Sequence, residues 1–307
     1  MESSNSTALV LKSFRPQRLN ELFRINLDDL ASSFGWEGRL LLASMLRVMF
    51  ALPAHKFARQ MLDFDGAVGR VGLVEAARQT QRLYVRSLRL FSPPLPAGPF
   101  LALSNHPGMV DTLALFSALN RSDLKIIAVA RPFLKALTNV SQRLYFVTDD
   151  PGTRMSVVRQ VSGHIRSGGA ILTFPAGKIE PDPNVYPGAV EALQDWTDSV
   201  GIFVRMAPET AILPVVVRGV IWDKTARHAL TRLKKEREER EKLAAALQLL
   251  AHVVLNKKPL DVTVQIGKPI TVAELGDKDT QTIHQAVLAE MKRLLEHPPE
   301  GPGESAL

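Results

Sequence analysis

FLALSNHPGMVDTLALF, residues 100–116, begins with an apolar run that predicts a β-strand over Phe100–Ser104. Pro107 and Gly108 interrupt the run and predict a turn. The apolar residues that follow predict a helix near 111–119. The segment therefore predicts a buried strand that passes through a tight turn into a helix, which is the unit from which α/β folds are built.

The residues after this segment repeat the alternation of short apolar runs with helical runs. Together they predict an α/β fold with a mostly parallel central sheet flanked by helices, because parallel strands need long crossovers that are usually helical. The expected strands are Phe100–Ser104, Lys125–Ala130, Leu144–Thr148, Ala170–Phe174, Ile212–Val217 and Val262–Ile266. The expected helices lie near 111–119, 153–167, 187–199 and 279–296.

The residues before this segment show no clear strand alternation. Leu40–Leu52 and Val71–Leu90 have helical periodicity. Residues 91–98, FSPPLPAG, hold three prolines and a glycine, which is typical of a loop between domains. We therefore expect an N-terminal helical region at 1–95 and an α/β domain at 96–300.

Two later segments depart from the alternation. Residues 225–255 mix seven basic with four acidic residues before an Ala- and Leu-rich end, and predict a long helix or helical hairpin inserted before the last strand. Its basic part, 225–242, fits a solvated helix face, whereas its apolar continuation, Leu243–Leu255, fits a helix resting on a membrane. The last residues, 297–307, are rich in proline and glycine, and we expect them to be frayed.

Composition excludes several classes of protein. The 307 residues are 46% hydrophobic and 22% charged, which excludes collagen-like, low-complexity and wholly disordered chains. The mean hydropathy of +0.02 is far below that of a polytopic membrane protein. The absence of cysteine excludes disulfides, cysteine-based metal centres and thiol nucleophiles.

The sequence predicts neither export nor a transmembrane helix. The N-terminus has no apolar run long enough for a signal peptide. Leu40–Leu52 contains Arg47 and is closed by Pro53, so it falls short of the roughly 20 apolar residues that span a bilayer. We expect this stretch to be a helix buried in the fold or lying in a membrane interface.

The net charge of +7 is compatible with nucleic acid, anionic lipid or a phosphorylated substrate as a partner. The basic residues of 225–242 are interleaved with four glutamates and with no aromatic side chains. Because stacking platforms and an unbroken basic surface are the features of nucleic-acid-binding segments, we expect no nucleic-acid partner.

His106 and Asp111 are the residues of the opening segment that carry acid–base chemistry. A helix that begins near Asp111 lets the carboxylate fold back toward the imidazole, accept from one ring N–H and leave the other nitrogen as a general base. The same two residues also fit a helix-capping aspartate beside an unrelated surface histidine. Since G-x-G-x-x-G, G-x-x-x-x-G-K, H-E-x-x-H and G-x-S-x-G motifs are absent, such a base would act on a substrate hydroxyl or a water.

Asn105–Asp111, NHPGMVD, resembles the N-H-x4-D motif of the glycerolipid acyltransferase superfamily, the bacterial 1-acylglycerol-3-phosphate acyltransferase-like proteins. Later segments are similar to further blocks of that family and come in its order. They are Leu124–Lys135 (LKIIAVARPFLK), Leu144–Arg154 (LYFVTDDPGTR), 170–181 (AILTFPAGKIEP, similar to an F-P-E-G block) and 211–219 (AILPVVVRG). Several blocks in order are much more specific than any one of them.

The resemblance implies an acyltransferase that moves a fatty acyl group from acyl-CoA or acyl-carrier protein to a lipid or glycerol hydroxyl. It implies His106 as general base and Asp111 as the residue that orients it, with backbone N–H groups around Gly177 facing the oxyanion. It implies no metal and no cofactor besides the acyl thioester co-substrate. The expected substrate-binding residues are Asn105, Arg131, Arg154, Phe174, Pro175, Gly177, Lys178 and Pro214.

The chain departs from the family pattern where a substrate phosphate would be held. Ala176 stands where the family has a glutamate, and Lys178 follows the glycine in place of a Thr-Arg pair. Lys178 is either an anion-binding residue or a solvated loop lysine. Arg154 either reaches an anionic substrate or pairs with a neighbouring aspartate, and Arg131 is an anion-binding or a surface residue. Pro214 predicts an edge or bulge position, because proline removes a ladder donor.

We therefore expect an O-acyltransferase of phospholipid biosynthesis, acting on a lysophospholipid or glycerol phosphate. The alternatives are a non-catalytic lipid-binding relative and an acyltransferase for a non-phosphate lysolipid. The expected partners are the acyl thioester, the lipid or glycerol phosphate acceptor and a membrane surface. The expected location is cytoplasmic and peripheral on the membrane.

Overall fold

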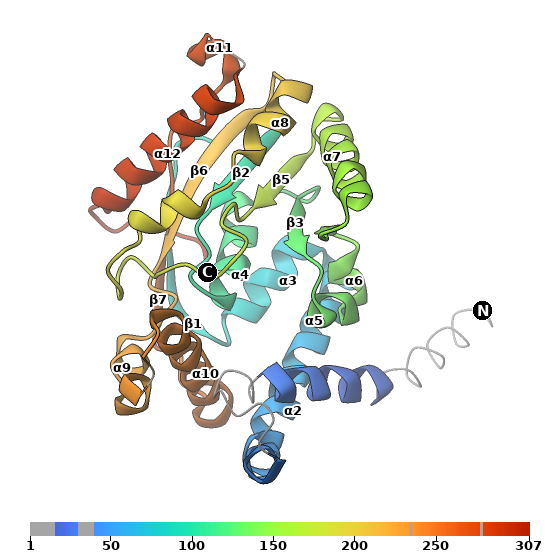
Figure 1. Cartoon of the computed structure of the whole chain (residues 1–307), viewed down its shortest axis with the longest axis vertical. Helices are drawn as coiled ribbons and strands as arrows, with labels where there is room; N and C mark the ends of the chain where they lie inside the picture. Colours follow the sequence, from blue (N-terminus) through green and yellow to red (C-terminus); the bar gives the residue numbers. More distant parts are fainter. Residues whose placement is uncertain (1–15, 30–39, 234, 277–278) are drawn as a thin grey trace, which may run out of the picture.

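The computed structural model describes residues 16–29, 40–233, 235–276 and 279–307. Within these residues the centre of the molecule is an eight-stranded sheet of order β4-β3-β5-β2-β6-β7-β1-β8 (Figure 1). The strands are β1 Val85–Phe91, β2 Phe100–Ser104, β3 Lys125–Val129, β4 Leu144–Val147, β5 Ala170–Thr173, β6 Ala211–Arg218, β7 Leu260–Ile266 and β8 Glu304–Ser305.

The sheet is mostly parallel, as the sequence predicts. β2 to β6 all run in one direction. β7 pairs antiparallel with β6 and parallel with β1, and β8 pairs antiparallel with β1. The carboxyl ends of β2 to β6 therefore meet at one edge, where the loops of an open α/β sheet form their binding sites.

Helices cover both faces of the sheet (Figure 1). The α-helices are α2 Leu40–Val71, α3 Leu73–Gln81, α4 Met109–Leu119, α5 Pro132–Ala136, α6 Thr138–Ser141, α7 Pro151–Arg166, α8 Ser199–Met206, α9 Asp223–Ala226, α10 Arg237–Leu255, α11 Val272–Leu275 and α12 Thr280–Glu296. Residues 16–29 are also helical. Short 3₁₀ helices span Glu191–Asp195 (η1) and Ala229–Leu233 (η2).

The core consists of two main apolar clusters, one on each face. Phe100 and Ala102 of β2 pack with α2, α3 and α4, whereas Leu101 and Leu103 pack with α7, α8 and α12. Successive side chains of a strand point to opposite faces, so an apolar residue at every position of β2 serves both layers. This explains why the opening segment reads as a continuous apolar run.

The helix predicted at Leu40–Leu52 does not end at Pro53. α2 continues through Pro53 to Val71. Phe50 is buried, whereas Val48 and Leu52 are 81% and 73% exposed, so the described side chains of this stretch do not all lie in the core. Proline removes one backbone donor, and the packing of the following turns against the core maintains the helix across that gap.

The second half of the predicted helix Val71–Leu90 is a strand. α3 ends at Gln81, and β1 begins at Val85 and pairs with β7. Val85 and Leu88 are buried, a spacing that a helix and a strand end can both produce. The pairing partner lies far along the chain, so local periodicity does not reveal it. β1 belongs to the same sheet as the later strands, so the region predicted to be helical contributes a strand to the α/β sheet. The domain boundary at 95/96 itself stays a prediction.

Two other predicted segments differ from the structure. Residues 187–199 form η1 followed by an extended residue, Trp196, and α8 begins only at Ser199. The C-terminal residues are not all frayed, because Glu304–Ser305 pairs with β1 and the Ala306 N–H donates to the Leu88 carbonyl. In both segments tertiary contacts outweigh the local composition.

Pro214 lies in a central strand, so the predicted edge position is wrong, but its missing N–H falls at an interruption of the ladder. β6 lies between β2 and β7, and Pro214 is opposite Leu103 of β2. On the other side the regular β6–β7 pairing begins at Val215, and Ile212 pairs separately with Ile270. Proline is therefore tolerated because the neighbouring strand leaves the ladder at this point.

Residues 225–255 form the predicted helical insertion, with the end of α9, then η2 and then α10 before β7. α9, α10 and the first part of α2 gather at one end of the molecule (Figure 1). No helix among the described residues combines the length and apolar character needed to cross a membrane.

Candidate active site

The loop between β2 and α4 lies at the carboxyl end of the parallel strands and is anchored to β6. The Asn105 amide donates to the Val217 carbonyl (3.0 Å), and the Val217 N–H donates to Asn105 Oδ1 (2.8 Å). The buried side chain thus continues the β2–β6 ladder after β2 has ended. The structure gives Asn105 a role in positioning the loop, and its substrate contact stays a prediction.

His106 and Asp111 are brought together as the spacing predicts. His106 Nδ1 lies 2.9 Å from Asp111 Oδ2. Asp111 is fully buried in the first turn of α4, where it also accepts from the Gly108 N–H (2.9 Å) and the Thr112 hydroxyl (2.9 Å). The aspartate is therefore a helix cap that also binds the imidazole, and the alternative of a capping aspartate beside an unrelated histidine is wrong.

The electrostatics favour the protonated form of His106. Burial lowers the pKa of His106, but the charge of Asp111, its hydrogen bond and the charge of Glu180 outweigh burial and raise the pKa above its ordinary value. The His106 side chain remains 26% exposed. Its ring packs against Phe174, with the two ring centroids 4.4 Å apart. With Nδ1 engaged by Asp111, Nε2 is the nitrogen left to exchange a proton with a ligand.

Glu180 is a second carboxylate at His106, and the sequence analysis does not predict it. Its Oε2 accepts from the His106 N–H (3.0 Å), and its own N–H donates to the His106 carbonyl (2.9 Å). Its Oε1 accepts from the Trp196 indole N–H (2.8 Å). Burial raises the pKa of Glu180 to about 7, against the lowering effect of these donors and of His106.

Asp182, two residues later, ties the same loop to the end of β6. Its carboxylate accepts from the N–H groups of Gly219 (3.0 Å), Val220 (2.7 Å) and Ile221 (2.9 Å). Gly219 has φ +76°, and a Cβ there would lie 2.3 Å from the Asp261 carbonyl oxygen, so only glycine fits. These hydrogen bonds therefore fix the position of the Glu180 loop relative to the His106 loop.

The predicted substrate-binding residues of the 174–178 block differ in what they contact. Phe174 faces His106 as described. Pro175 accepts from the Thr197 N–H (3.3 Å), and Gly177 has φ +63° and donates its N–H to the Phe174 carbonyl (3.0 Å). The Gly177 N–H is thus engaged in the turn in this structure, so it is not preorganised for an oxyanion.

The three predicted anion-binding cations lie beside carboxylates. Lys178 Nζ is 3.0 Å from Asp195, and Arg154 contacts Asp149 (3.2 Å) and the Thr148 carbonyl (3.0 Å). The Arg154 contact is the aspartate pair that the sequence offered as the alternative. Burial raises the pKa of Asp29, and the charge of exposed Arg131 opposes that rise. Their roles in substrate binding stay predictions.

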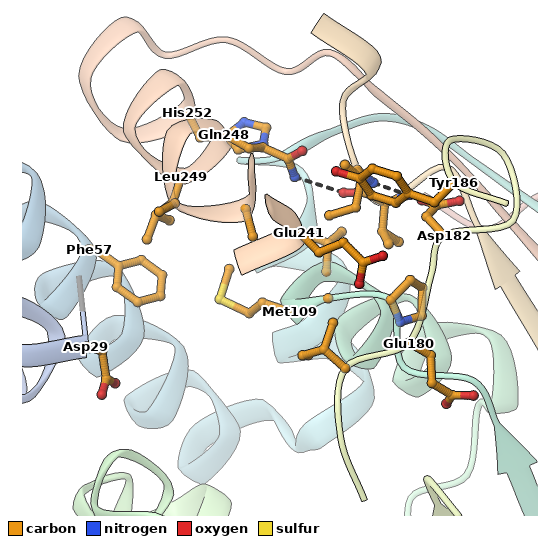
Figure 2. Close-up of a pocket in the computed structure, with 18 of the residues that line it drawn as sticks. Asp29, Phe57, Met109, Glu180, Asp182, Tyr186, Glu241, Gln248, Leu249 and His252 are labelled. Atoms are coloured by element: carbon orange, nitrogen blue, oxygen red, sulfur yellow. Dashed lines mark hydrogen bonds between the residues drawn. The ribbon is translucent and has the colours of Figure 1, made fainter. Parts of the chain in front are cut away.

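A largely apolar cavity of about 320 Å³ lies behind the His106 loop (Figure 2). Pro107, Gly108 and Met109 form one wall, and Glu180 borders it. Figure 2 shows Phe57, Met109 and Leu249 around the same space, so α2, α4 and α10 all contribute. Gln248 of α10 closes the wall by accepting from the Trp222 N–H (2.6 Å) and donating to the Val220 carbonyl (2.8 Å).

Glu180, Asp182 and Trp196 are the site residues that sequence reasoning missed. A signal was present, because Glu180 and Asp182 follow a buried strand at the carboxyl edge of a parallel sheet. Neither has a partner close in sequence that would single it out. Within the part of the chain that the structure describes, no group of three or more His, Asp or Glu side chains is arranged to hold a metal ion.

Residues 79–218 match the sequence model of a protein family described as Acyltransferase. A solved structure with a similar chain is that of the 1-acyl-sn-glycerophosphate (LPA) acyltransferase PlsC from Thermotoga maritima. The two chains are 14% identical, with a TM-score of 0.41, over 93% of this chain and 97% of that chain. No curated protein matches the chain.

The matched range contains β2, the His106–Asp111 pair and the Glu180 loop. These residues therefore lie in a segment that matches the acyltransferase family, in agreement with the resemblance that the motifs give. The match supports acyl transfer as the activity of this domain.

Proposed function

We propose that this protein transfers a fatty acyl group from acyl-CoA or acyl-carrier protein to the hydroxyl of a lysophospholipid or glycerol phosphate, in phospholipid biosynthesis. The observation that carries the proposal is the 2.9 Å contact between His106 Nδ1 and buried Asp111 at the carboxyl end of β2. This arrangement leaves Nε2 of a partly exposed imidazole as a general base.

The proposed reaction is a direct transfer. His106 Nε2 takes the proton of the acceptor hydroxyl as its oxygen attacks the thioester carbonyl carbon, and Asp111 stabilises the imidazolium that forms. A C–O bond forms, and the C–S bond breaks as the tetrahedral intermediate collapses. The thiolate then takes the proton from the imidazolium and leaves as a thiol, so His106 returns to its starting state.

The apolar cavity supports a fatty acyl substrate. Its walls come from α2, α4 and α10 and are formed mostly by carbon atoms of side chains such as Phe57, Met109 and Leu249. Burying an alkyl chain there is favourable by about 0.8 kcal/mol for each methylene removed from water. We propose that the acyl chain lies in this cavity, with its carbonyl end near His106.

We propose a membrane surface as the place where the enzyme meets its lipid acceptor. Leu52 of α2 and Leu255 of α10 are 73% and 62% exposed, and a groove of about 520 Å³ runs between α2, α9 and α10. Trp222 lines the groove, with the ammonium groups of Lys224 and Lys257 5.8 and 6.0 Å from its ring centroid. Exposed apolar residues beside lysines and tryptophan suit an anionic lipid interface.

The first test is release of free thiol from acyl-CoA, and separately from acyl-carrier protein, with a panel of lysophospholipid and glycerol phosphate acceptors. We expect acceptor-dependent turnover in the wild type and a loss of about 10²- to 10⁴-fold in His106→Ala, the range expected for a general base.

Binding to phosphatidylglycerol vesicles, measured by sedimentation, tests the membrane partner, with a Leu52→Ser/Leu255→Ser double variant as the comparison.

The outcomes separate the candidate functions. Turnover with a phosphate-free lysolipid alone would replace the proposed acceptor class. A folded protein that binds lipid but transfers no acyl group with any pair of substrates would contradict the proposal and favour the non-catalytic relative. Vesicle binding that the double variant leaves unchanged would contradict the proposed membrane surface.

A further inference from the structure

Two carboxylates meet at His106, but they contact it in different ways. Asp111 contacts the imidazole, whereas Glu180 contacts the backbone on both sides of the residue. The His106 N–H donates to the Glu180 carboxylate, and the His106 carbonyl accepts from the Glu180 N–H. Glu180 therefore fixes the main chain from which the imidazole projects.

Burial raises the pKa of Glu180 to about 7, and the hydrogen-bond donors around its carboxylate favour the ionised form that exists above that pH. Each oxygen faces an N–H donor, one from His106 at 3.0 Å and one from Trp196 at 2.8 Å, and the residue is only 3% exposed. A protonated carboxyl or an amide would place a hydrogen against one of those donors. The charged groups that face Glu180 are His106, which favours its ionised form, and Asp111, which opposes it.

We propose that Glu180 is a positioning residue of the acyl transfer, which holds the His106 backbone in place and adds a second negative charge that stabilises the imidazolium formed when the acceptor hydroxyl loses its proton. The inference rests on the proposed function. Glu180 itself exchanges no atom with the substrates, and the proton moves between the hydroxyl oxygen, His106 Nε2 and the leaving thiolate as described above.

The geometry explains why one residue performs both tasks. Glu180 lies in the loop after β5, and β5 is paired with β2, so the two loops leave neighbouring strands at the same edge. Asp182 binds the N–H groups that follow β6 and so fixes the position of that loop. A carboxylate that accepts from the His106 N–H also lies near the imidazole of the same residue. Because the protein interior screens charge less than water does, the carboxylate charge stabilises the imidazolium.

The matched variants are Glu180→Gln and Trp196→Phe. The first removes the charge and one of the two acceptor oxygens, and the second removes only the other donor to the same carboxylate. We expect Glu180→Gln to lower kcat by about 10- to 100-fold at pH values above about 7, where Glu180 is ionised, with a smaller change in KM, because a misplaced base costs rate more than binding.

Trp196→Phe should behave differently. Loss of the indole N–H removes a donor that lowers the pKa of Glu180, so more of the carboxylate is protonated at pH 7. We therefore expect a loss of kcat at pH 7 that is recovered near pH 8.5. A purely structural role predicts that both variants lose activity alike at every pH and lose thermal stability in proportion.

An NMR titration of the His106 imidazole in the full chain provides a readout that needs no substrate. The His106 resonance is assigned as the one missing from His106→Ala. We expect a lower pKa of His106 in Glu180→Gln than in the wild type, and a smaller lowering in Trp196→Phe, where Glu180 keeps its charge at high pH.

An unchanged His106 titration in Glu180→Gln, or a kcat within about twofold of the wild type, overturns the proposal. If Glu180→Gln and Trp196→Phe lose activity equally at all pH values, Glu180 has a structural role only, and the proposal is again overturned. A wild type that transfers no acyl group with any substrate contradicts the proposed function, and the titration still decides whether Glu180 controls the charge on His106.

Discussion

The loops at 105–111 and 174–182 lie side by side at the same edge of the sheet, yet sequence reasoning succeeded in one and only partly in the other. In the first, His106 and Asp111 are five residues apart and meet as predicted. In the second, Lys178 lies beside Asp195, and Glu180 faces His106. The difference is that the first contact is set within one turn and helix, whereas the second depends on where two loops meet.

Helix geometry explains the local success. A carboxylate in the first turn of α4 satisfies free N–H groups there, so Asp111 is drawn back toward the Gly108 N–H and hence toward His106. The 174–182 loop has no such local rule. Its course is set by Asp182, whose carboxylate binds three N–H groups after β6.

Asp111→Asn should give the largest effect, and it tests the local pair. The asparagine keeps an acceptor for the His106 N–H but removes the charge that stabilises the imidazolium. We expect kcat to fall roughly 10²- to 10³-fold, measured by thiol release, with a lower pKa of His106. Thr112→Val, which removes only the hydroxyl bond to Asp111, is the control and should lose much less. Equal losses in the two variants would mean that Asp111 acts mainly as a helix cap.

Glu180→Gln tests the long-range carboxylate through stability. Folded Glu180 has a pKa of about 7 against an ordinary value of 4.5, so between these values the folded protein holds a proton that the unfolded chain has released. This contribution makes the wild type less stable as the pH rises through that window. We expect the free energy of unfolding of Glu180→Gln, relative to wild type, to rise by roughly 3 kcal/mol between pH 4 and pH 8 in urea titrations. A pH-independent difference would contradict the buried-carboxylate account.

Gly219→Ala and Gly177→Ala compare the two ends of the same site. Both glycines have positive φ, but a Cβ at Gly219 would collide with the Asp261 carbonyl, whereas nothing lies within 4 Å of one at Gly177. We expect a loss of about 3 kcal/mol at Gly219 and about 1 kcal/mol at Gly177. Thermal denaturation provides the measurement. Equal losses would show that the backbone conformation alone sets the cost.

Lys178→Ala should give the smallest effect. Lys178 and Asp195 form an ion pair whose side chains are 54% and 41% exposed, so we expect the free energy of unfolding to change by less than about 0.5 kcal/mol. We also expect KM for the acyl donor and the acceptor to change less than about threefold, because the lysine already faces a carboxylate. A larger rise in KM for one anionic substrate would support the anion-binding role that the sequence suggested.

Local patterns in the sequence predict the α/β class, six of the eight strands of the sheet and the contact of His106 with Asp111. Phe100–Ser104 is apolar at every position because it serves two cores, and Asp111 is near His106 because the chain between them is short. These features depend on contacts within one strand, turn or helix, so local patterns contain them.

Packing between distant segments sets the remaining features of the fold and the site. β1 was hidden because its partner, β7, lies far along the chain, and the same is true of β8. The course of α2 beyond Pro53, the cavity between α2, α4 and α10, and the contact of Glu180 with His106 each need several elements packed together. A local residue pattern does not indicate which distant backbone N–H a carboxylate will contact, because the packing of the whole sheet sets the distance between the two groups.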